Sequence, residues 1–529
     1  MSDSRIDHRY DRRISALINA RVPAVLSGGL KGVEKESLRV DSDGRIAQTA
    51  HPAALGSSLT HEHITTDYSE ALLELVTPTF TESWELIQYL TDLHQFVYMH
   101  LDQEVLWATS MPCRLRGDAS IPIAQFGRSN VAQMKHVYRR GLGLRYGRIM
   151  QAISGVHFNY SFPTHFWEVW SEVCGRKEGA SQDFISASYF DVLRNYRRHG
   201  WIVPYLFGAS PAVCRSFVDG RDDHGLTDLG QGTLYSAYAT SLRMSDLGYR
   251  NKNQAAVSIS VNTLDEYIRD LSAAISTPHL DYQRLGVEVD GEWRQLNANT
   301  LQIENEYYAF IRPKRVAFSG ERPTKALRRA GVQYVEMRSL DVSILDPVGV
   351  NQGKLRFLEA FAAFCVLAPS PPLSSGEQSA LDANHATVAR RGREPGLALS
   401  LEGRPLALGI WGREILDAME GVCEMLDAGD TARPYTNSLR TARSKFENAE
   451  LTPSARILRE MESTGESFYD LAARISNGYR DYFRDLAPLE PHRIAQFERE
   501  VRDSVEAHAN VEASDRGDFR TYLAGYFSD

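Results

Sequence analysis

Long apolar runs are missing from this chain of 529 residues. The longest, from Phe357 to Pro369, contains Glu359 and falls short of the roughly 18 apolar residues that a membrane-spanning helix needs. The first residues, MSDSRIDHRYDRRIS, are too polar for the apolar part of a secretory signal. We therefore expect a soluble, cytoplasmic protein.

Cysteine is scarce, and no two cysteines form a CxxC pair. Scattered cysteines in an odd number are typical of reduced thiols in a cytoplasmic protein. A single disulfide remains an alternative, because spacing alone does not exclude one. The five positions are Cys113, Cys174, Cys214, Cys365 and Cys423.

The common nucleotide-binding and hydrolytic motifs are also absent. The segment Gly349–Lys354 has the wrong spacing for a P-loop and lacks its hydroxyl residue, and Gly141 and Gly143 are not followed by a third glycine at the dinucleotide-binding spacing. No HExxH, GxSxG or zinc-type Cys/His spacing occurs. A net charge of −9 argues against a general nucleic-acid binder. A bound nucleotide would have to be held through metal-bridged phosphates.

Three short segments with alternating polar residues are the most informative feature present. Side chains alternate between the two faces of a strand, so residues two apart lie on one face, about 7 Å from each other. This places the following pairs on common faces of predicted strands: Glu34 with Glu36, His157 with Asn159, and Glu336 with Arg338. Carboxylates gathered in a cavity repel one another unless a cation lies between them. A solvated polar face is the commoner explanation of any single pair, but the repetition of the pattern predicts a Mg²⁺ or Mn²⁺ site.

Other acidic residues extend this pattern. Glu74 stands alone in an apolar run that we expect to be a strand, and metal coordination would satisfy its charge. Glu304 and Glu306 show the same alternation. Asp67 and Glu70 have the spacing of a helix capping box, which is an alternative to a ligand role for Asp67.

Basic residues cluster at Arg139, Arg243, Arg312–Arg315 and Arg338. Arginine binds carboxylate and phosphate oxygens with two hydrogen bonds, so these positions suit an amino-acid carboxylate or a nucleotide phosphate. For Arg312–Arg315 an exposed surface stretch is an equally good interpretation. Because the candidate residues run from 34 to 338, we expect one catalytic sheet-and-helix unit over 1–376. The segment PSPPLSSG, rich in Pro, Ser and Gly that interrupt helices and strands, ends this unit. We expect residues 377–529 to form a mainly helical part that packs on the same unit.

Several long segments of this sequence resemble the proteobacterial type of glutamate–cysteine ligase (γ-glutamylcysteine synthetase). They occur in order and include GVEKESLRV, ALGSSLTHEHITTDYSEALLELVTP, MQAISGVHFNYSFP, GWIVPYLFGASPAVC, LQIENEYYAFIRPKR and VEMRSLDV. The resemblance implies an α+β fold like that of glutamine synthetase, with a funnel-shaped antiparallel sheet backed by helices. It also implies two or three Mg²⁺ ions at the narrow end of the funnel and ATP as cosubstrate.

The resemblance further implies roles for individual residues. The metal ligands would be Glu34, Glu36, Asp67, Glu74, His157 and Glu336. Arg338 would meet the transferred phosphate, Arg243 the glutamate, and the cysteine substrate would contact Arg139, Tyr138, Tyr68, Tyr249 and Tyr308.

The implied reaction is the first step of glutathione biosynthesis. L-Glutamate, activated as γ-glutamyl phosphate, is joined to L-cysteine by a monomer that glutathione can inhibit. The alternatives are a related glutamate–amine ligase or phosphotransferase with another acceptor, and a non-catalytic protein that binds a metal or an amino acid.

Overall fold

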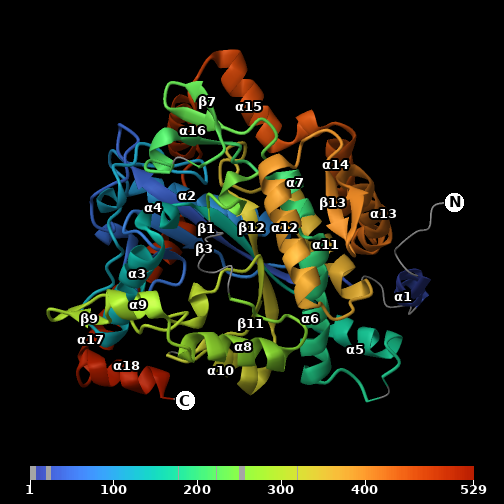
Figure 1. Ribbon diagram of the computed structural model, residues 1–529, viewed down its shortest axis with the longest axis horizontal. Helices are drawn as coiled ribbons and strands as arrows, with labels where there is room; N and C mark the ends of the chain where they lie inside the picture. The colour runs from blue at the N-terminus through green and yellow to red at the C-terminus, as the bar shows by residue number, and fades with distance from the viewer. Residues whose placement is uncertain are drawn as a thin grey trace.

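An antiparallel sheet lies at the centre of the molecule (Figure 1). The structure is a computed structural model that describes residues 8–19, 25–176, 178–221, 223–248, 257–318 and 320–528. The sheet follows the order β11-β12-β5-β1-β3-β2, and β4 also pairs with β1. Its strands are β1 (Leu30–Val40), β2 (Ile64–Thr66), β3 (Leu72–Val76), β4 (Val105–Leu106), β5 (Gly155–Ser161), β11 (Ile311–Lys314) and β12 (Tyr334–Asp341).

Helices surround this sheet. The helices in the first 376 residues are α1 (His8–Asn19), α2 (Ser83–Met99), α3 (Asn130–Tyr146), α4 (Arg148–Gln151), α5 (Thr164–Val173), α6 (Gln182–His199), α7 (Ile202–Phe207), α8 (Leu264–Ser276), α9 (Leu280–Leu285), α10 (Pro323–Ala330) and α11 (Gln352–Leu367). Those that follow are α12 (Ser375–Arg391), α13 (Leu408–Leu426), α14 (Pro434–Glu447), α15 (Pro453–Thr464), α16 (Phe468–Asp485), α17 (Pro491–Ser514) and α18 (Phe519–Phe527). No described helix is both long and apolar enough to cross a membrane.

Smaller strands complete the fold. They are β6 (Ala212–Cys214), β7 (Thr227–Gly230), β8 (Thr233–Tyr235), β9 (Glu288–Val289), β10 (Glu292–Trp293), β13 (Ala398–Leu401) and β14 (Arg404–Ala407). The α+β class with an antiparallel sheet and many helices is therefore confirmed. The division at residue 376 stays a prediction, and apolar residues from both sides of it, such as Val33 and Trp411, share one core.

The two faces of the sheet differ because side chains alternate along each strand. Val33, Phe158 and Met337 point to the back face, where they are buried in the main apolar core with residues of α2, α6 and α11. Their neighbours Glu34 and His157 point to the opposite face. One sheet therefore supplies a closed apolar layer on one side and a layer of polar side chains on the other.

Cys113 and Cys214 form a disulfide, with their Cα atoms 5.2 Å apart. The expectation that all five cysteines are reduced is wrong for this pair; Cys174, Cys365 and Cys423 are free thiols. The two bonded cysteines lie in the same apolar cluster but 101 residues apart in the chain. Packing between distant segments brings them together, and spacing in the sequence carries no sign of it.

Two local expectations are also corrected. Glu304–Glu306 forms a short 3₁₀ helix, not a strand, so the two carboxylates do not share a strand face. Asp67 and Glu70 lie in the turn between β2 and β3, not at the start of a helix, so they form no capping box. Glu70 there accepts hydrogen bonds from the backbone N–H groups of His51 and Gln125, at 2.8 and 2.6 Å.

Candidate active site

The register of the central strands gathers the predicted acidic residues on one face. Glu34 on β1 pairs with His157 on β5, and Glu36 pairs with Glu74 on β3. On the next strand, Glu336 lies opposite Asn159. The three alternating segments were recognised separately in the sequence, and antiparallel pairing places them side by side.

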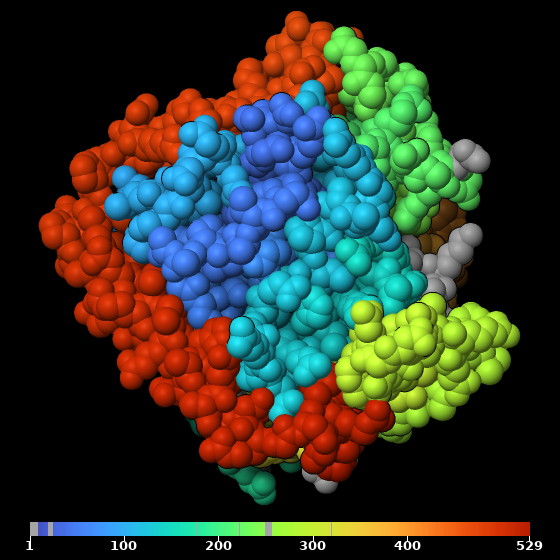
Figure 2. Space-filling view, turned by 90° about the vertical axis from the view of Figure 1, so that its left-hand side faces the viewer, coloured from blue at the N-terminus to red at the C-terminus, as the bar shows by residue number. Residues whose placement is uncertain are grey.

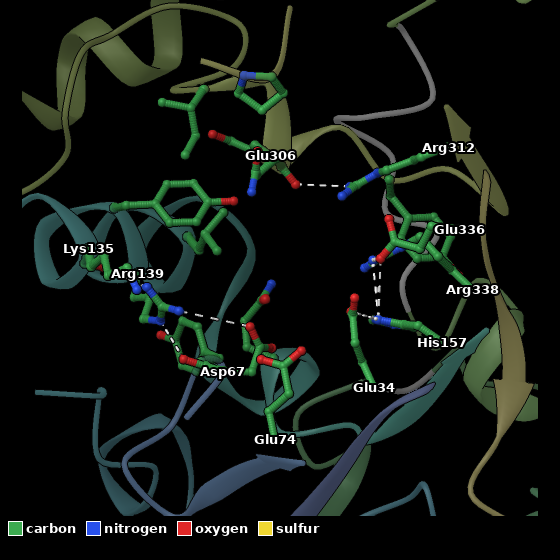
Figure 3. A pocket seen from close by; sticks show the side chains of 18 of the residues that line it. Glu34, Asp67, Glu74, Lys135, Arg139, His157, Glu306, Arg312, Glu336 and Arg338 are labelled. Carbon is green, nitrogen blue, oxygen red and sulfur yellow. Dashed lines mark hydrogen bonds and ion pairs between the residues drawn. The ribbon is translucent and has the colours of Figure 1, made fainter. Parts of the chain in front are cut away.

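Glu34, His157 and Glu336 form the tightest group (Figure 3). The Nδ1 atom of His157 lies 3.1 Å from Glu34 Oε2 and 3.5 Å from Glu336 Oε1. One nitrogen or oxygen atom from each of the three side chains lies within 4.8 Å of the other two. Among the described residues, no other three His, Cys, Asp or Glu side chains come this close together. Burial and the charge of Arg338 lower the pKa of His157, which favours the neutral imidazole that binds metals.

Glu36, Glu74 and Asp67 form a second acidic group beside the first. Burial and the charge of Asp67 raise the pKa of Glu36 to about 8. Burial raises the pKa of Glu74 well above its ordinary value, and the charges of Glu34, Asp67 and Glu36 raise it further. Carboxylates that face one another in this way hold protons unless a cation replaces them. Oxygen ligands of this kind suit a hard divalent cation such as Mg²⁺.

Cationic side chains lie next to the first acidic group. Arg338 Nη1 donates to Glu336 Oε1 at 2.5 Å, and Lys314 Nζ lies 3.3 Å from Glu336 Oε2. Arg312 on β11 pairs in register with Glu336. The basic residues of Arg312–Arg315 do not all face the cavity. Arg312 and Lys314 line it from β11, whereas Arg315, the residue after this strand, donates to the carbonyl of Gly331 at 2.8 Å.

These groups line one cavity of about 480 Å³. Strands supply its acidic floor, and α3 supplies a wall with Lys135, Tyr138 and Arg139. Arg139 is anchored on Asp67, with Nη2 4.0 Å from Oδ1 and Nε donating to the backbone carbonyl. Further lining residues are Glu34, Glu36, Tyr68, Glu74, Met134, Leu142, Tyr146, Met150, Gln151, His157, Ile303, Asn305, Glu306, Tyr308, Arg312, Lys314, Glu321, Pro323, Glu336, Arg338 and Tyr526. A cavity with an anionic floor and cationic sides can hold a metal–phosphate complex together with a small anionic substrate.

Comparison with known proteins agrees with this geometry. The family model described as glutamate-cysteine ligase matches residues 14–388. The glutamate–cysteine ligase of Alcanivorax borkumensis is 46% identical over 524 residues, which cover 98% of this chain and 99% of that protein. The ligase of Pseudomonas aeruginosa is 46% identical over 515 residues, 97% of each chain. The chain belongs to the glutamate–cysteine ligase family.

Solved structures support the same assignment. The crystal structure of the Francisella tularensis glutamate–cysteine ligase in complex with AMP has a TM-score of 0.88 and 35% identity, covering 94% of this chain and 97% of that chain. A bifunctional glutathione synthetase from Pasteurella multocida has a TM-score of 0.71 and 24% identity, covering 89% of this chain and 55% of that chain. The second likeness shows the fold alone.

One residue assigned through the family resemblance, Arg243, lies differently from the other described candidates. Arg243 is 1% exposed and is not among the described residues that line the cavity. It lies on the same face of the sheet as His157, beside the acidic floor, where Nη2 donates to the carbonyl of Arg338 at 3.1 Å and Nη1 lies 3.8 Å from Asp341 Oδ1. A side chain at Gly155 would collide with its guanidinium, which explains the glycine at the start of β5. Tyr249 lies outside the described residues.

Sequence reasoning missed several residues that line the cavity. Lys135 lies one helical turn before Arg139 on α3, so the spacing of four residues was a signal that could have found it. Ile303, Asn305 and Tyr526 come from an irregular segment and from the last helix, and no periodic pattern marks them. Site residues on helices and irregular segments are thus harder to predict from the sequence than those on strands.

Proposed function

We propose that this protein is an ATP-dependent ligase that joins the γ-carboxylate of L-glutamate to the amino group of L-cysteine, the first step of glutathione biosynthesis. The observation that carries the proposal is the convergence of six potential metal ligands and five cations in one cavity of a glutamate–cysteine ligase family member. The metal ligands are Glu34, Glu36, Asp67, Glu74, His157 and Glu336, and the cations are Lys135, Arg139, Arg312, Lys314 and Arg338.

The side chains present fit two or three Mg²⁺ ions, with Mn²⁺ as an alternative. Oxygen ligands dominate the set, and acidic groups whose pKa values are raised by one another become ionised when a cation is bound. When bound, the metal ions would neutralise phosphate oxygens of ATP and reduce the repulsion met by an incoming carboxylate. Asn159 Nδ2 donates to Glu34 Oε1 at 2.9 Å, which holds that carboxylate in a ligating position.

The proposed reaction has two steps. A γ-carboxylate oxygen of glutamate bonds to the γ-phosphorus of ATP, the bond from that phosphorus to the bridging oxygen breaks, and ADP leaves. The cysteine nitrogen then bonds to the acyl carbon, releases a proton and expels inorganic phosphate. Arg338 and Lys314, which both form ion pairs with Glu336, would stabilise the charge on the phosphoryl oxygens during both steps.

The proposal assigns the substrates to the remaining charged groups. Arg139 suits the carboxylate of cysteine, with Tyr138, Tyr68 and Tyr308 around it in the cavity wall. Arg243, beside the acidic floor, would bind glutamate, and Tyr249 would complete the cysteine pocket. Glutathione carries the γ-glutamylcysteine unit, so it would compete for the same cavity as a feedback inhibitor. A cytoplasmic monomer would suffice, because one chain supplies every one of these groups.

An assay of ADP and phosphate release tests the proposal. With Mg²⁺, ATP and glutamate, adding cysteine is expected to start steady ADP formation and to yield γ-glutamylcysteine, identified by mass. 2-Aminobutyrate should partly replace cysteine because the thiol takes no part in the chemistry, whereas glycine and ammonia should not. Equal turnover with ammonia or glycine would contradict the choice of acceptor, and absence of glutamate-dependent ADP formation would contradict the ligase activity itself.

A further inference from the structure

A buried carboxylate at the end of β12 lies close to the acidic floor but does not line the cavity. Asp341 is the last residue of this strand and pairs in register with Gly155, the first residue of β5. Its side chain is fully shielded from solvent. Burial of a carboxylate is costly unless hydrogen bonds and a counter-ion replace the lost water. The partners of Asp341 therefore show what its charge acts on.

Three hydrogen bonds hold the two oxygens of this carboxylate. Oδ2 accepts from the backbone N–H of Ala209 at 2.7 Å and from the hydroxyl of Ser210 at 2.6 Å. Oδ1 accepts from the hydroxyl of Ser241 at 2.8 Å. The green surface at the upper right of Figure 2 belongs to the part of the chain between these two serines, which carries the exposed strand β7, whereas both serines are buried. Asp341 thus connects both ends of that part of the chain to the central sheet.

The same two serines fix the short 3₁₀ helix that carries Arg243. The hydroxyl of Ser241 caps this helix by accepting from the backbone N–H of Met244 at 3.3 Å. The hydroxyl of Ser210 accepts from the backbone N–H of Arg243 at 3.4 Å. Within the described part of the chain, Arg243 is also the one cation that pairs with Asp341, with Nη1 3.8 Å from Oδ1. Asp341 therefore acts on both the backbone and the charge of Arg243.

The guanidinium of Arg243 is one residue away from two residues that line the cavity, Glu36 and Tyr308. A Cβ atom at Gly155 would lie 2.0 Å from Arg243 Nη2, and the backbone N–H of Gly155 donates to Glu36 at 2.6 Å. Arg243 Nη1 donates to the sulfur of Met244 at 3.0 Å, and the hydroxyl of Tyr308 donates to the same sulfur at 3.3 Å. The orientation of this guanidinium therefore sets where its positive charge lies relative to the cavity.

From these contacts we propose that Asp341 is a positioning residue for glutamate binding and acts through Arg243. Three donors already occupy its oxygens, so at 3.8 Å it attracts the guanidinium without the two short hydrogen bonds of a tight arginine–carboxylate pair. An arginine that is oriented before the substrate arrives loses less entropy when it binds a carboxylate. The inference rests on the proposed function, in which Arg243 binds glutamate.

Asp341→Asn tests the inference in the full-length protein, because it removes the charge and keeps the shape of the side chain. In steady-state assays the KM for glutamate is expected to rise about tenfold, the usual effect of removing a group that orients a ligand-binding side chain. The kcat and the KM values for ATP and cysteine should change less than about twofold. Since KM does not depend on the amount of folded protein, partial unfolding cannot imitate this result.

Asp427→Asn is the matched control. Asp427 is also buried and accepts three hydrogen bonds, from the backbone N–H groups of Tyr435 and Thr436 at 2.9 and 2.8 Å and from the Thr436 hydroxyl at 2.6 Å. It does not line the cavity. The control should lose thermal stability as Asp341→Asn does, and its KM for glutamate should equal that of the wild type.

A double variant shows whether Asp341 acts through Arg243. Arg243→Gln alone should raise the KM for glutamate by more than Asp341→Asn does, and it should lower stability because it leaves a buried carboxylate unpaired. Adding Asp341→Asn should restore part of that stability and change the KM for glutamate by less than about twofold, because the group that it orients is gone. If the two effects on KM multiplied, Asp341 would act by another route, and the inference would be wrong.

Other results would also overturn the inference. One is an unchanged KM for glutamate in Asp341→Asn, and another is an equal rise in KM for all three substrates, which would indicate general distortion of the site. A higher Mg²⁺ requirement with an unchanged KM for glutamate would show that the charge acts on Glu36 instead. Absence of glutamate-dependent ADP formation in the wild type would contradict the proposed function itself, and the substrate assigned to Arg243 with it.

Discussion

Two Glu-x-Glu segments of this chain look alike in the sequence and have opposite surroundings in the structure. Glu34 and Glu36 extend from β1 toward other acidic residues. Glu304 and Glu306 lie on a 3₁₀ turn, and each meets an arginine. The Glu304 carboxylate lies 3.0 Å from Arg322, and the Glu306 carboxylate 2.9 Å from Arg145. All four carboxylates are largely buried, so burial alone does not distinguish a site from a structural ion pair.

The partner of each carboxylate makes the difference. A buried acid that meets an arginine and has no second carboxylate beside it is already neutralised and needs no further ligand. Glu36 instead faces Glu74 across the β1–β3 pair, and within the described part of the chain its Oε2 atom accepts a hydrogen bond only from the backbone N–H of Gly155, at 2.6 Å. Carboxylates that face one another repel and so destabilise the cation-free protein. Binding of a cation between them replaces this repulsion with attraction. The comparison therefore predicts opposite effects of removing a charge. At Glu36 the loss should lower turnover and spare stability, whereas at Glu304 it should lower stability and spare turnover.

The largest effect is expected for Glu36→Gln. Its turnover should fall on the order of 1000-fold, because a neutral amide cannot hold the metal–phosphate charge in the cavity. Its thermal stability without metal should stay equal to that of the wild type or rise. The pKa of Glu36 is raised to about 8, so the wild-type carboxyl is largely protonated at pH 7 and resembles an amide. Coupled ADP assays and thermal denaturation in EDTA measure the two quantities. Turnover near the wild-type level at saturating Mg²⁺ would contradict the metal assignment.

A smaller and opposite effect is expected for Glu304→Gln. The substitution leaves the Arg322 charge without its partner in a buried position and weakens the contact with Thr324, which donates to Glu304 at 2.5 Å. Loss of one partner of a buried ion pair should lower the free energy of unfolding by about 3 kcal/mol. Turnover per folded molecule should stay near the wild-type value, since Glu304 does not line the cavity in the described part of the chain. Denaturant titration measures the stability, and an unchanged midpoint would remove the distinction between the segments.

The site residues that lie on strands could be predicted from the sequence, because the alternation of residues along a strand is a local pattern. A period of two on each strand shows which residues share a face, and this was sufficient for Glu34 with Glu36, for His157 with Asn159, and for Glu336 with Arg338. The same rule was misleading at Glu304 because that segment is not a strand. No local pattern shows whether an acid will meet an arginine from elsewhere in the chain.

The remaining features depend on packing between distant segments. The Cys113–Cys214 bond closes 101 residues, and Tyr526 reaches the cavity only because α18 packs on α3. Neither has a sequence signal apart from residue type. The family resemblance supplied the overall fold class and the list of candidate ligands, which periodicity alone could not have limited to six residues.

The smallest expected effect concerns pH and metal binding. The pKa of Glu36 is raised from 4.5 to about 8 by burial and by Asp67, so the folded, metal-free protein holds a proton there that the unfolded chain releases above about pH 4.5. Stability without metal should therefore fall as the pH rises from about 4.5 to about 8. Metal binding displaces that proton, so the affinity for Mg²⁺ should rise by up to about tenfold per pH unit below pH 8 and level off above it.

Calorimetric titrations of Mg²⁺ in two buffers with different ionisation enthalpies measure the protons released. Glu36→Gln should release about one proton fewer than the wild type at pH 7, because the amide has none to lose. Glu304→Gln is the control and should release the same number as the wild type, since Arg322 already neutralises that carboxylate. If both variants released as many protons as the wild type, the proton would reside elsewhere, and the contrast between the two Glu-x-Glu segments would not extend to metal binding.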